Sequence, residues 1–170
     1  MRPIVFSLVL LCLTLWASEG HTFSYTHADV TYGYVDTDAE TGGGLGLGVS
    51  AAMRPNTHLF GGFGSVDGDT RVTLGAGYRH KARSDMDVVL RAAFMDIAKE
   101  NGLRLDGGVR TWISNLDVHT GLFVVNLDSN NDAGVFAQAV STITGGLGLV
   151  AKLAFSDAYT VLEVGLRFAY

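Results

Sequence analysis

The feature that most constrains the fold is an alternation of apolar residues with polar or small ones. In the segment 162–170 (LEVGLRFAY) apolar side chains occupy every second position, with Glu163, Gly165 and Arg167 between them. Successive side chains of a β-strand point to opposite faces, so this pattern predicts a strand with one apolar face and one polar face. The same alternation recurs along the chain, for example at 28–34, 45–53, 72–78 and 147–155. No helical period is visible after residue 20.

Short stretches rich in Gly, Asn, Asp and Ser separate the alternating segments, as turns require. They lie at 36–41, 54–57, 67–69, 81–85, 98–102, 114–115, 128–132, 142–146 and 156–158. Nine separators predict about ten strands, and strands of roughly 9–11 residues are long enough to cross a bilayer when tilted. Eight longer strands are the alternative, if the stretch 67–69 and one other separator are bulges.

The polar faces favour a closed interior over a water-soluble sandwich. Outward positions of a sandwich are rich in Lys, Glu and Thr, whereas here they are Gly, Ala, Ser and a few charges, mostly Arg. The predicted fold is therefore all-β: a closed, antiparallel, up-and-down transmembrane β-barrel. Charges buried inside it must be paired. The predicted polar network of the lumen comprises Asp29, Arg71, Arg91, Asp106, Arg110, His119, Lys152, Glu163 and Arg167, with its three acids as candidate partners of the cations.

Composition supports this interpretation. The chain is 48% hydrophobic, but no stretch after the first twenty residues holds the apolar run that a membrane-spanning helix needs. The formal net charge of −5 disfavours a nucleic-acid partner, because nucleic-acid binding needs a basic patch.

Residues 1–20 have the pattern of a cleaved secretory signal peptide. Arg2 precedes an apolar run at 4–16, and the small residues Ser18 and Gly20 predict cleavage before His21, which leaves 21–170 as the barrel. A retained anchor is disfavoured because the run is short for a span. A lipoprotein is disfavoured because Leu11 is not the small residue expected before a lipidated cysteine. The single cysteine, Cys12, lies in this segment, so the mature chain has no disulfide framework.

The last strand carries a second targeting pattern. Glu163, Gly165, Phe168 and Tyr170 resemble the C-terminal insertion signal of bacterial outer-membrane barrels. That resemblance implies residence in the outer membrane, with lipid and lipopolysaccharide around the barrel. It also implies that periplasmic chaperones and the barrel-insertion machinery handle the chain during biogenesis.

Longer segments resemble one family of small barrels. They are TFSYTHADVTYGYVDTD (22–38), NTHLFGGFGSVDGDT (56–70), LGAGYRHKARSDMDVVLRAAF (74–94) and LDGGVRTW (105–112). They resemble the small outer-membrane barrels once proposed as activators of plant immunity, and more loosely the opacity-type and OmpX-like barrels. The family has no established catalytic residues to carry over.

The residues themselves point to no catalytic, cofactor or metal site. The five histidines are spread out, with no pair at metal-ligand spacing, and His27 and His119 are predicted to face the lumen. No His-x-Ser occurs, which disfavours a lipid A-modifying enzyme. The Gly-rich stretch 42–48 lacks the lysine of a phosphate-binding loop. Trp112 is predicted to face inward at a strand end.

Acidic residues fall in the connections expected outside the cell, and Arg54, Arg79, His80, Lys81 and Arg83 in those expected in the periplasm. The acids could bind divalent cations that bridge lipopolysaccharide, or the loops could simply be polar. The predicted function is a non-catalytic envelope barrel that contributes to membrane integrity or surface contacts. A narrow, porin-like passive channel is one alternative, but the interior of a small barrel is just wide enough for its own side chains. A lipid A-modifying enzyme is the other.

Overall fold

The computed structural model describes residues 23–37, 41–66, 68–97, 100–128 and 131–169. The predicted signal peptide at 1–20 and Tyr170 of the predicted insertion signal lie outside the described residues.

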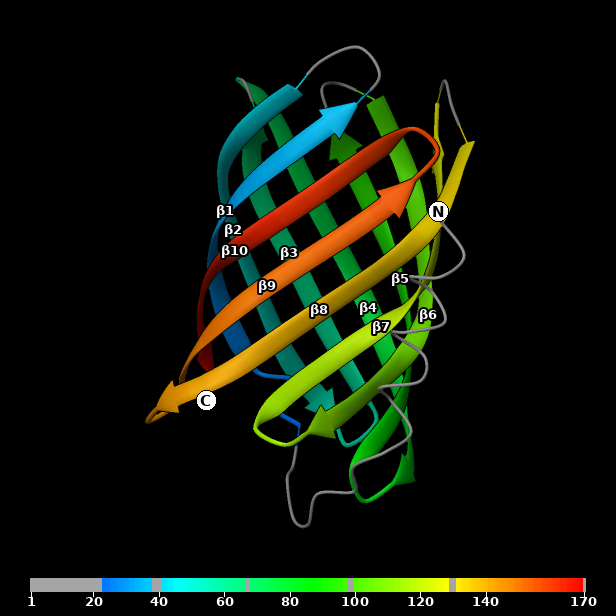
Figure 1. The fold of residues 1–170 in the computed structure, drawn as a ribbon. Coiled ribbons are helices and arrows are strands. Elements are labelled where there is room, and N and C mark those ends of the chain that lie inside the picture. The colour runs from blue at the N-terminus through cyan, green and yellow to red at the C-terminus, as the bar shows by residue number, and fades with distance from the viewer. Residues whose placement is uncertain (1–22, 38–40, 67, 98–99, 129–130, 170) are drawn as a thin grey trace, which may run out of the picture.

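Ten antiparallel strands form one closed barrel (Figure 1). They are β1 (His27–Thr37), β2 (Thr41–Arg54), β3 (Thr57–Val66), β4 (Asp69–Arg83), β5 (Met86–Ile97), β6 (Glu100–Ile113), β7 (Leu116–Leu127), β8 (Asn131–Thr144), β9 (Leu147–Ser156) and β10 (Tyr159–Ala169). Each strand pairs with its neighbours in the chain, and β1 closes the barrel on β10. The predicted fold class is confirmed, with ten strands rather than eight.

The connections divide into two ends. The turns β2–β3, β4–β5, β6–β7 and β8–β9 lie at what we call the turn end, at the bottom of Figure 1. The other five connections lie at the opposite end, which we call the loop end. Pairing of β1 with β10 runs from His27 opposite Ala169, at the turn end, to Thr37 opposite Tyr159, at the loop end.

The outer surface of the barrel is apolar and its inner wall is polar. Outward side chains are largely exposed, such as Leu74 at 68% and Leu45 at 67%, whereas Asp29 and Arg167 on the inner wall are 4% and 5% exposed. This arrangement is the reverse of a soluble protein and is typical of a transmembrane barrel. None of the residues that the structure describes forms a helix long and apolar enough to cross a membrane.

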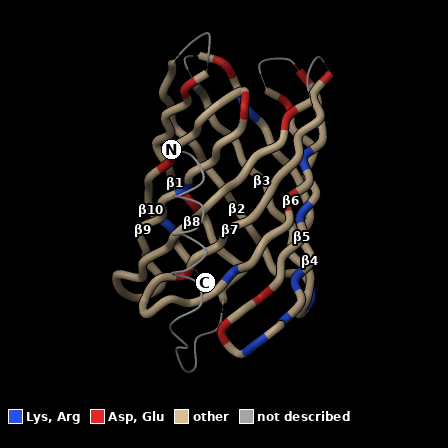
Figure 2. The backbone as a smooth tube through the Cα atoms, turned by 45° about the vertical axis from the view of Figure 1, so that its right-hand side comes forward, with Lys and Arg blue, Asp and Glu red and all other residues tan. Residues whose placement is uncertain are grey.

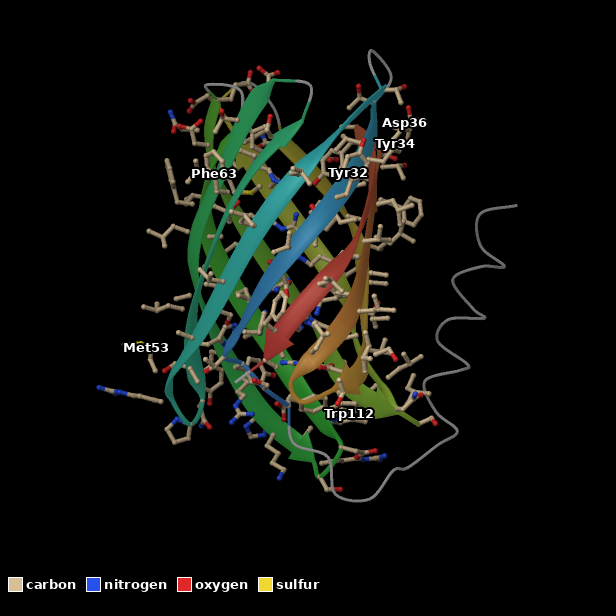
Figure 3. The ribbon with its side chains drawn as sticks, turned by 90° about the vertical axis from the view of Figure 1, so that its left-hand side faces the viewer. Tyr32, Tyr34, Asp36, Met53, Phe63 and Trp112 are labelled. Carbon is tan, nitrogen blue, oxygen red and sulfur yellow. The ribbon has the colours of Figure 1, made fainter. Side chains whose placement is uncertain are left out.

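Exposed aromatic side chains gather near the two rims of this apolar surface. Tyr32, Tyr34 and Phe63 lie toward the loop end (Figure 3), and Tyr78 and Phe168 lie on the outward face nearer the turn end. Aromatic girdles at both membrane interfaces are a general feature of transmembrane barrels.

Charge differs between the two ends (Figure 2). The acids at the loop end include Asp36, Asp69, Glu100, Asp132 and Asp157. The turn end carries the basic residues Arg54, Arg79, His80, Lys81 and Arg83, together with Asp85. The strand order therefore places these acids and bases toward opposite ends of the barrel, although the basic residues belong to the ends of β2 and β4 rather than to connections.

The position of an outward residue along its strand predicts how strongly a charge placed there destabilises the barrel. Leu105 lies in the interior of β6, where it is 59% exposed, and Leu116 is the first residue of β7 at the turn end, where it is 37% exposed. Leu105→Arg should lower the free energy of unfolding by about 2–4 kcal/mol, because it places a charge near the bilayer midplane. Leu116→Arg should lower it by about 0–1 kcal/mol.

The measurement is urea-induced unfolding of both variants in lipid vesicles. Equal losses for the two substitutions would contradict the assignment of this outer surface to lipid.

Candidate functional site

The inner wall of the barrel is the candidate site. All nine residues predicted to form a polar network face the lumen, and the structure joins eight of them in ion pairs. The ninth, His119, is buried beside the ring of Phe136, with ring centroids 4.9 Å apart.

One cluster of charges joins β1, β10, β9 and β4. Arg167 donates two hydrogen bonds to the carboxylate of Asp29, from Nε at 2.7 Å and from a terminal nitrogen at 2.8 Å. Lys152 Nζ lies 3.2 Å from Asp29 and 3.5 Å from Glu163. Arg71 completes the cluster at 2.7 Å from Glu163. Register explains two of these pairs, because Asp29 faces Arg167 and Glu163 faces Lys152 on adjacent strands.

A second cluster has two arginines on one carboxylate. Arg104 Nε lies 2.7 Å from one oxygen of Asp106, and Arg91 Nε lies 3.3 Å from the other. The guanidinium of Arg104 also lies over the ring of Phe123, 4.3 Å from its centroid, which adds a cation–π contact. Asp106 therefore neutralises only one of the two cations that it contacts.

Another deeply buried ion pair lies toward the turn end. Arg110 and Asp117 each have 6% of their side chain exposed, and Arg110 Nε contacts both carboxylate oxygens at 2.9 and 3.1 Å. A terminal nitrogen of Arg110 also donates to the backbone oxygen of Ser24 at 3.0 Å. Such a fork-shaped, doubly bonded pair is geometrically specific as well as strong.

Residues 23–26, which we call the N-terminal plug, pack against the inner wall near the turn end. Tyr25 is 7% exposed, and its hydroxyl donates to Asp87 at 2.9 Å. The ring of Phe23 stacks on Trp112, with centroids 5.9 Å apart. Trp112 thus lies inward at its strand end, as predicted, and Figure 3 places it at the turn end. The plug contacts strands far from β1 and partly fills this mouth of the barrel.

Four charged residues of the lumen were not predicted from the sequence. They are Arg79, Asp87, Arg104 and Asp117, all of which form ion pairs on the inner wall. Arg79 was expected in a periplasmic connection, whereas Asp87 and Asp117 lie one residue inside β5 and β7. The alternation of side chains along a strand could have assigned Asp87 and Asp117 to the lumen. Asp87 lies four positions before Arg91, and Asp117 lies two positions before His119, so each shares a face with a predicted lumen residue.

The residues of the predicted insertion signal divide between the two faces of β10. Glu163 points into the lumen, where it binds Arg71 and Lys152. Phe168 points outward and is 39% exposed. At Gly165 a Cβ would overlap the backbone of Val30 and Thr31, so the close approach of β1 favours glycine.

A cavity of about 130 Å³ remains within the lumen. Its charged and imidazole lining includes Asp29, Arg91, Arg110, Lys152, Arg167 and His119. Tyr25 of the N-terminal plug and the backbone of Gly48 also line it.

Burial of the ion pairs generates a second test. Asp117→Asn should lower the free energy of unfolding by about 3–5 kcal/mol, because it leaves the buried Arg110 without a counter-charge. Glu163→Gln is the matched control, since its partners Arg71 and Lys152 have 34% and 30% of their side chains exposed. Its loss should be about 1 kcal/mol.

Both substitutions keep the shape of the side chain. Equilibrium unfolding in detergent micelles measures the free energy of unfolding of both variants. A loss for Glu163→Gln as large as that for Asp117→Asn would contradict the prediction that the more buried ion pair contributes more to stability.

Comparison with known proteins finds likeness in structure. No protein-family model and no curated protein sequence matches the chain. The solved NanC porin matches with a TM-score of 0.63 and 12% identity, over 84% of this chain and 100% of its own. The KdgM porin matches with a TM-score of 0.57 and 12% identity, over 84% and 99%. A de novo designed transmembrane β-barrel matches with a TM-score of 0.50 and 14% identity, over 89% and 100%. At these identities the shared property is the fold, that of membrane-spanning β-barrels.

Proposed function

We propose that this chain is an integral protein of the bacterial outer membrane that performs no catalysis and contributes to the integrity or surface contacts of the envelope. The observation that carries the proposal is a closed barrel with its charges paired inside and an apolar surface outside. A closed barrel satisfies every backbone hydrogen bond within the wall, which is the condition for strands to cross a bilayer. The signal-peptide pattern at 1–20 supports export of the chain.

The contents of the lumen favour an envelope barrel over a passive channel. Ion pairs join strands of the inner wall at several levels, and the N-terminal plug packs into the turn end. Two of the similar structures are named porins, which suggests the channel alternative. In this chain the cavity of about 130 Å³ is small, and its charged side chains are held in ion pairs, some of which share a carboxylate.

A lipid A-modifying enzyme has less support. Chemistry on a lipid needs reactive groups at the outer surface of the barrel, where the lipid lies. His58 and His119, each 5% exposed, instead belong to the inner wall.

The proposed partners follow from the two ends of the barrel. Exposed acids at the loop end, such as Asp36 and Asp69, suit divalent cations that bridge the phosphates of lipopolysaccharide. Chaperones and the barrel-insertion machinery are proposed partners during biogenesis. Membership of the family once linked to plant immunity is a narrower proposal that rests on the sequence segments alone.

A planar-bilayer experiment tests the choice between envelope barrel and channel. The purified, folded protein should insert without producing stable current steps, because ion pairs cross the lumen and the turn end is partly filled. Insertion is verified separately by a heat-dependent shift in gel mobility. Reproducible single-channel steps from verified barrels would favour the passive channel.

The proposed insertion signal has its own test in cells. Phe168→Ala should strongly reduce the outer-membrane level of the protein while leaving refolding in detergent nearly normal. Phe155→Ala is the matched control, because Phe155 is also outward and similarly exposed, at 44% against 39%. Its effect on outer-membrane level should be small. Equal reductions for both variants would mean that Phe168 is an ordinary residue of the outer surface.

A further inference from the structure

The ion pairs of the lumen contain more cations than carboxylates. Eight pairs join seven cations to five carboxylates among the described residues. The cations are Arg71, Arg79, Arg91, Arg104, Arg110, Lys152 and Arg167, and the carboxylates are Asp29, Asp87, Asp106, Asp117 and Glu163. Seven minus five leaves two positive charges in this paired set without a carboxylate of their own. An enclosed charge without a counter-charge is unfavourable.

The excess is concentrated at the cavity. Four cations line it, namely Arg91, Arg110, Lys152 and Arg167, whereas Asp29 is the only carboxylate among its lining residues. Two of these cations share their carboxylates with other cations. Arg91 shares Asp106 with Arg104. Lys152 shares Glu163 with Arg71 and Asp29 with Arg167. The charged groups that line the cavity are therefore mainly cationic, because the carboxylates Asp106, Asp117 and Glu163 are not among its lining residues.

The cavity also has polar atoms without a partner. His119 Nε2 and His58 Nδ1 are buried and make no hydrogen bond within the described part of the chain, and both residues line the cavity. An unmade hydrogen bond at a buried polar atom is unfavourable. A ligand that bonds to such an atom would remove part of this cost.

We propose that this cavity binds a phosphate-sized inorganic oxyanion. A doubly charged oxyanion matches the excess of two cations, and its several oxygens can accept from guanidinium, ammonium and imidazole groups together. The volume of about 130 Å³ is several times what one water needs, so the ion and some of its water fit. This site goes beyond the proposed envelope function and does not depend on where the barrel resides.

Calorimetric titration with inorganic phosphate tests the proposal. The protein is refolded in a phosphate-free detergent without phospholipid, so that no lipid headgroup can supply the anion. One equivalent of phosphate should bind, and chloride at equal ionic strength should not compete.

Two matched variants locate the site. Lys152→Met and Arg71→Met each remove one of the two cations on Glu163, and each leaves that carboxylate the other. Lys152→Met also removes one of the two cations on Asp29, which keeps Arg167. Lys152 lines the cavity, whereas Arg71 is not among its lining residues. Lys152→Met should weaken phosphate binding by about 10-fold or more, as loss of a charged hydrogen bond implies, and Arg71→Met by less than about 3-fold.

A third variant fills the cavity without changing its charge. Gly48 lines the cavity, and a Cβ there would lie 3.6 Å from the Cβ of Asp29, which is an ordinary contact. Gly48→Leu should abolish phosphate binding in barrels that still show heat-dependent gel mobility. No binding by the unchanged protein, equal weakening by Lys152→Met and Arg71→Met, full competition by chloride, or undiminished binding by folded Gly48→Leu would each overturn the proposal.

Discussion

The structure depends on the pairing of β1 with β10. Eleven residue pairs, from His27 opposite Ala169 to Thr37 opposite Tyr159, join the first strand to the last and leave the sheet without an edge. In a bilayer an unpaired strand edge would expose backbone N–H and C=O groups that lipid cannot satisfy. Closure also determines which alternate residues face the lumen, because side chains of a strand alternate between the two faces. The polar interior and the apolar exterior both follow from it.

The same pairing places opposite charges beside one another. Asp29 faces Arg167, Arg91 faces Asp106, and Glu163 faces Lys152 on adjacent strands, and each of these cross-strand neighbours forms an ion pair. Backbone register and charge neutralisation therefore support one another. A shift of one residue would turn these charges toward lipid, which makes the register strongly specified.

The strands could be predicted because alternation and turn residues are local signals. The partners across the lumen could not, because they depend on side-chain reach and on diagonal neighbours. Asp29, Asp106 and Glu163 were the candidate partners of the cations, yet Arg110 binds Asp117, which lies across the β6–β7 turn and faces Trp112 rather than Arg110. The N-terminal plug was also missed, since residues 23–26 form no strand and their position depends on contacts such as Tyr25 with Asp87.

The glycines of the inner wall leave room for large side chains that project from the opposite wall. Inward positions of β2 and β3 include Gly46, Gly48, Gly62 and Gly64, whereas the strands across the barrel contribute Phe123, Phe136, Val125 and Val140. The interior of a small barrel is just wide enough for its side chains, so bulk on one wall requires small residues on the other. Gly77 shows the limit, because a Cβ there would overlap the imidazole of His58. The cavity lies where this compensation is incomplete, beside Gly48 and Gly61, and the charged residues that line it are four cations and one carboxylate. Small residues on one wall therefore leave the space that the proposed anion would occupy.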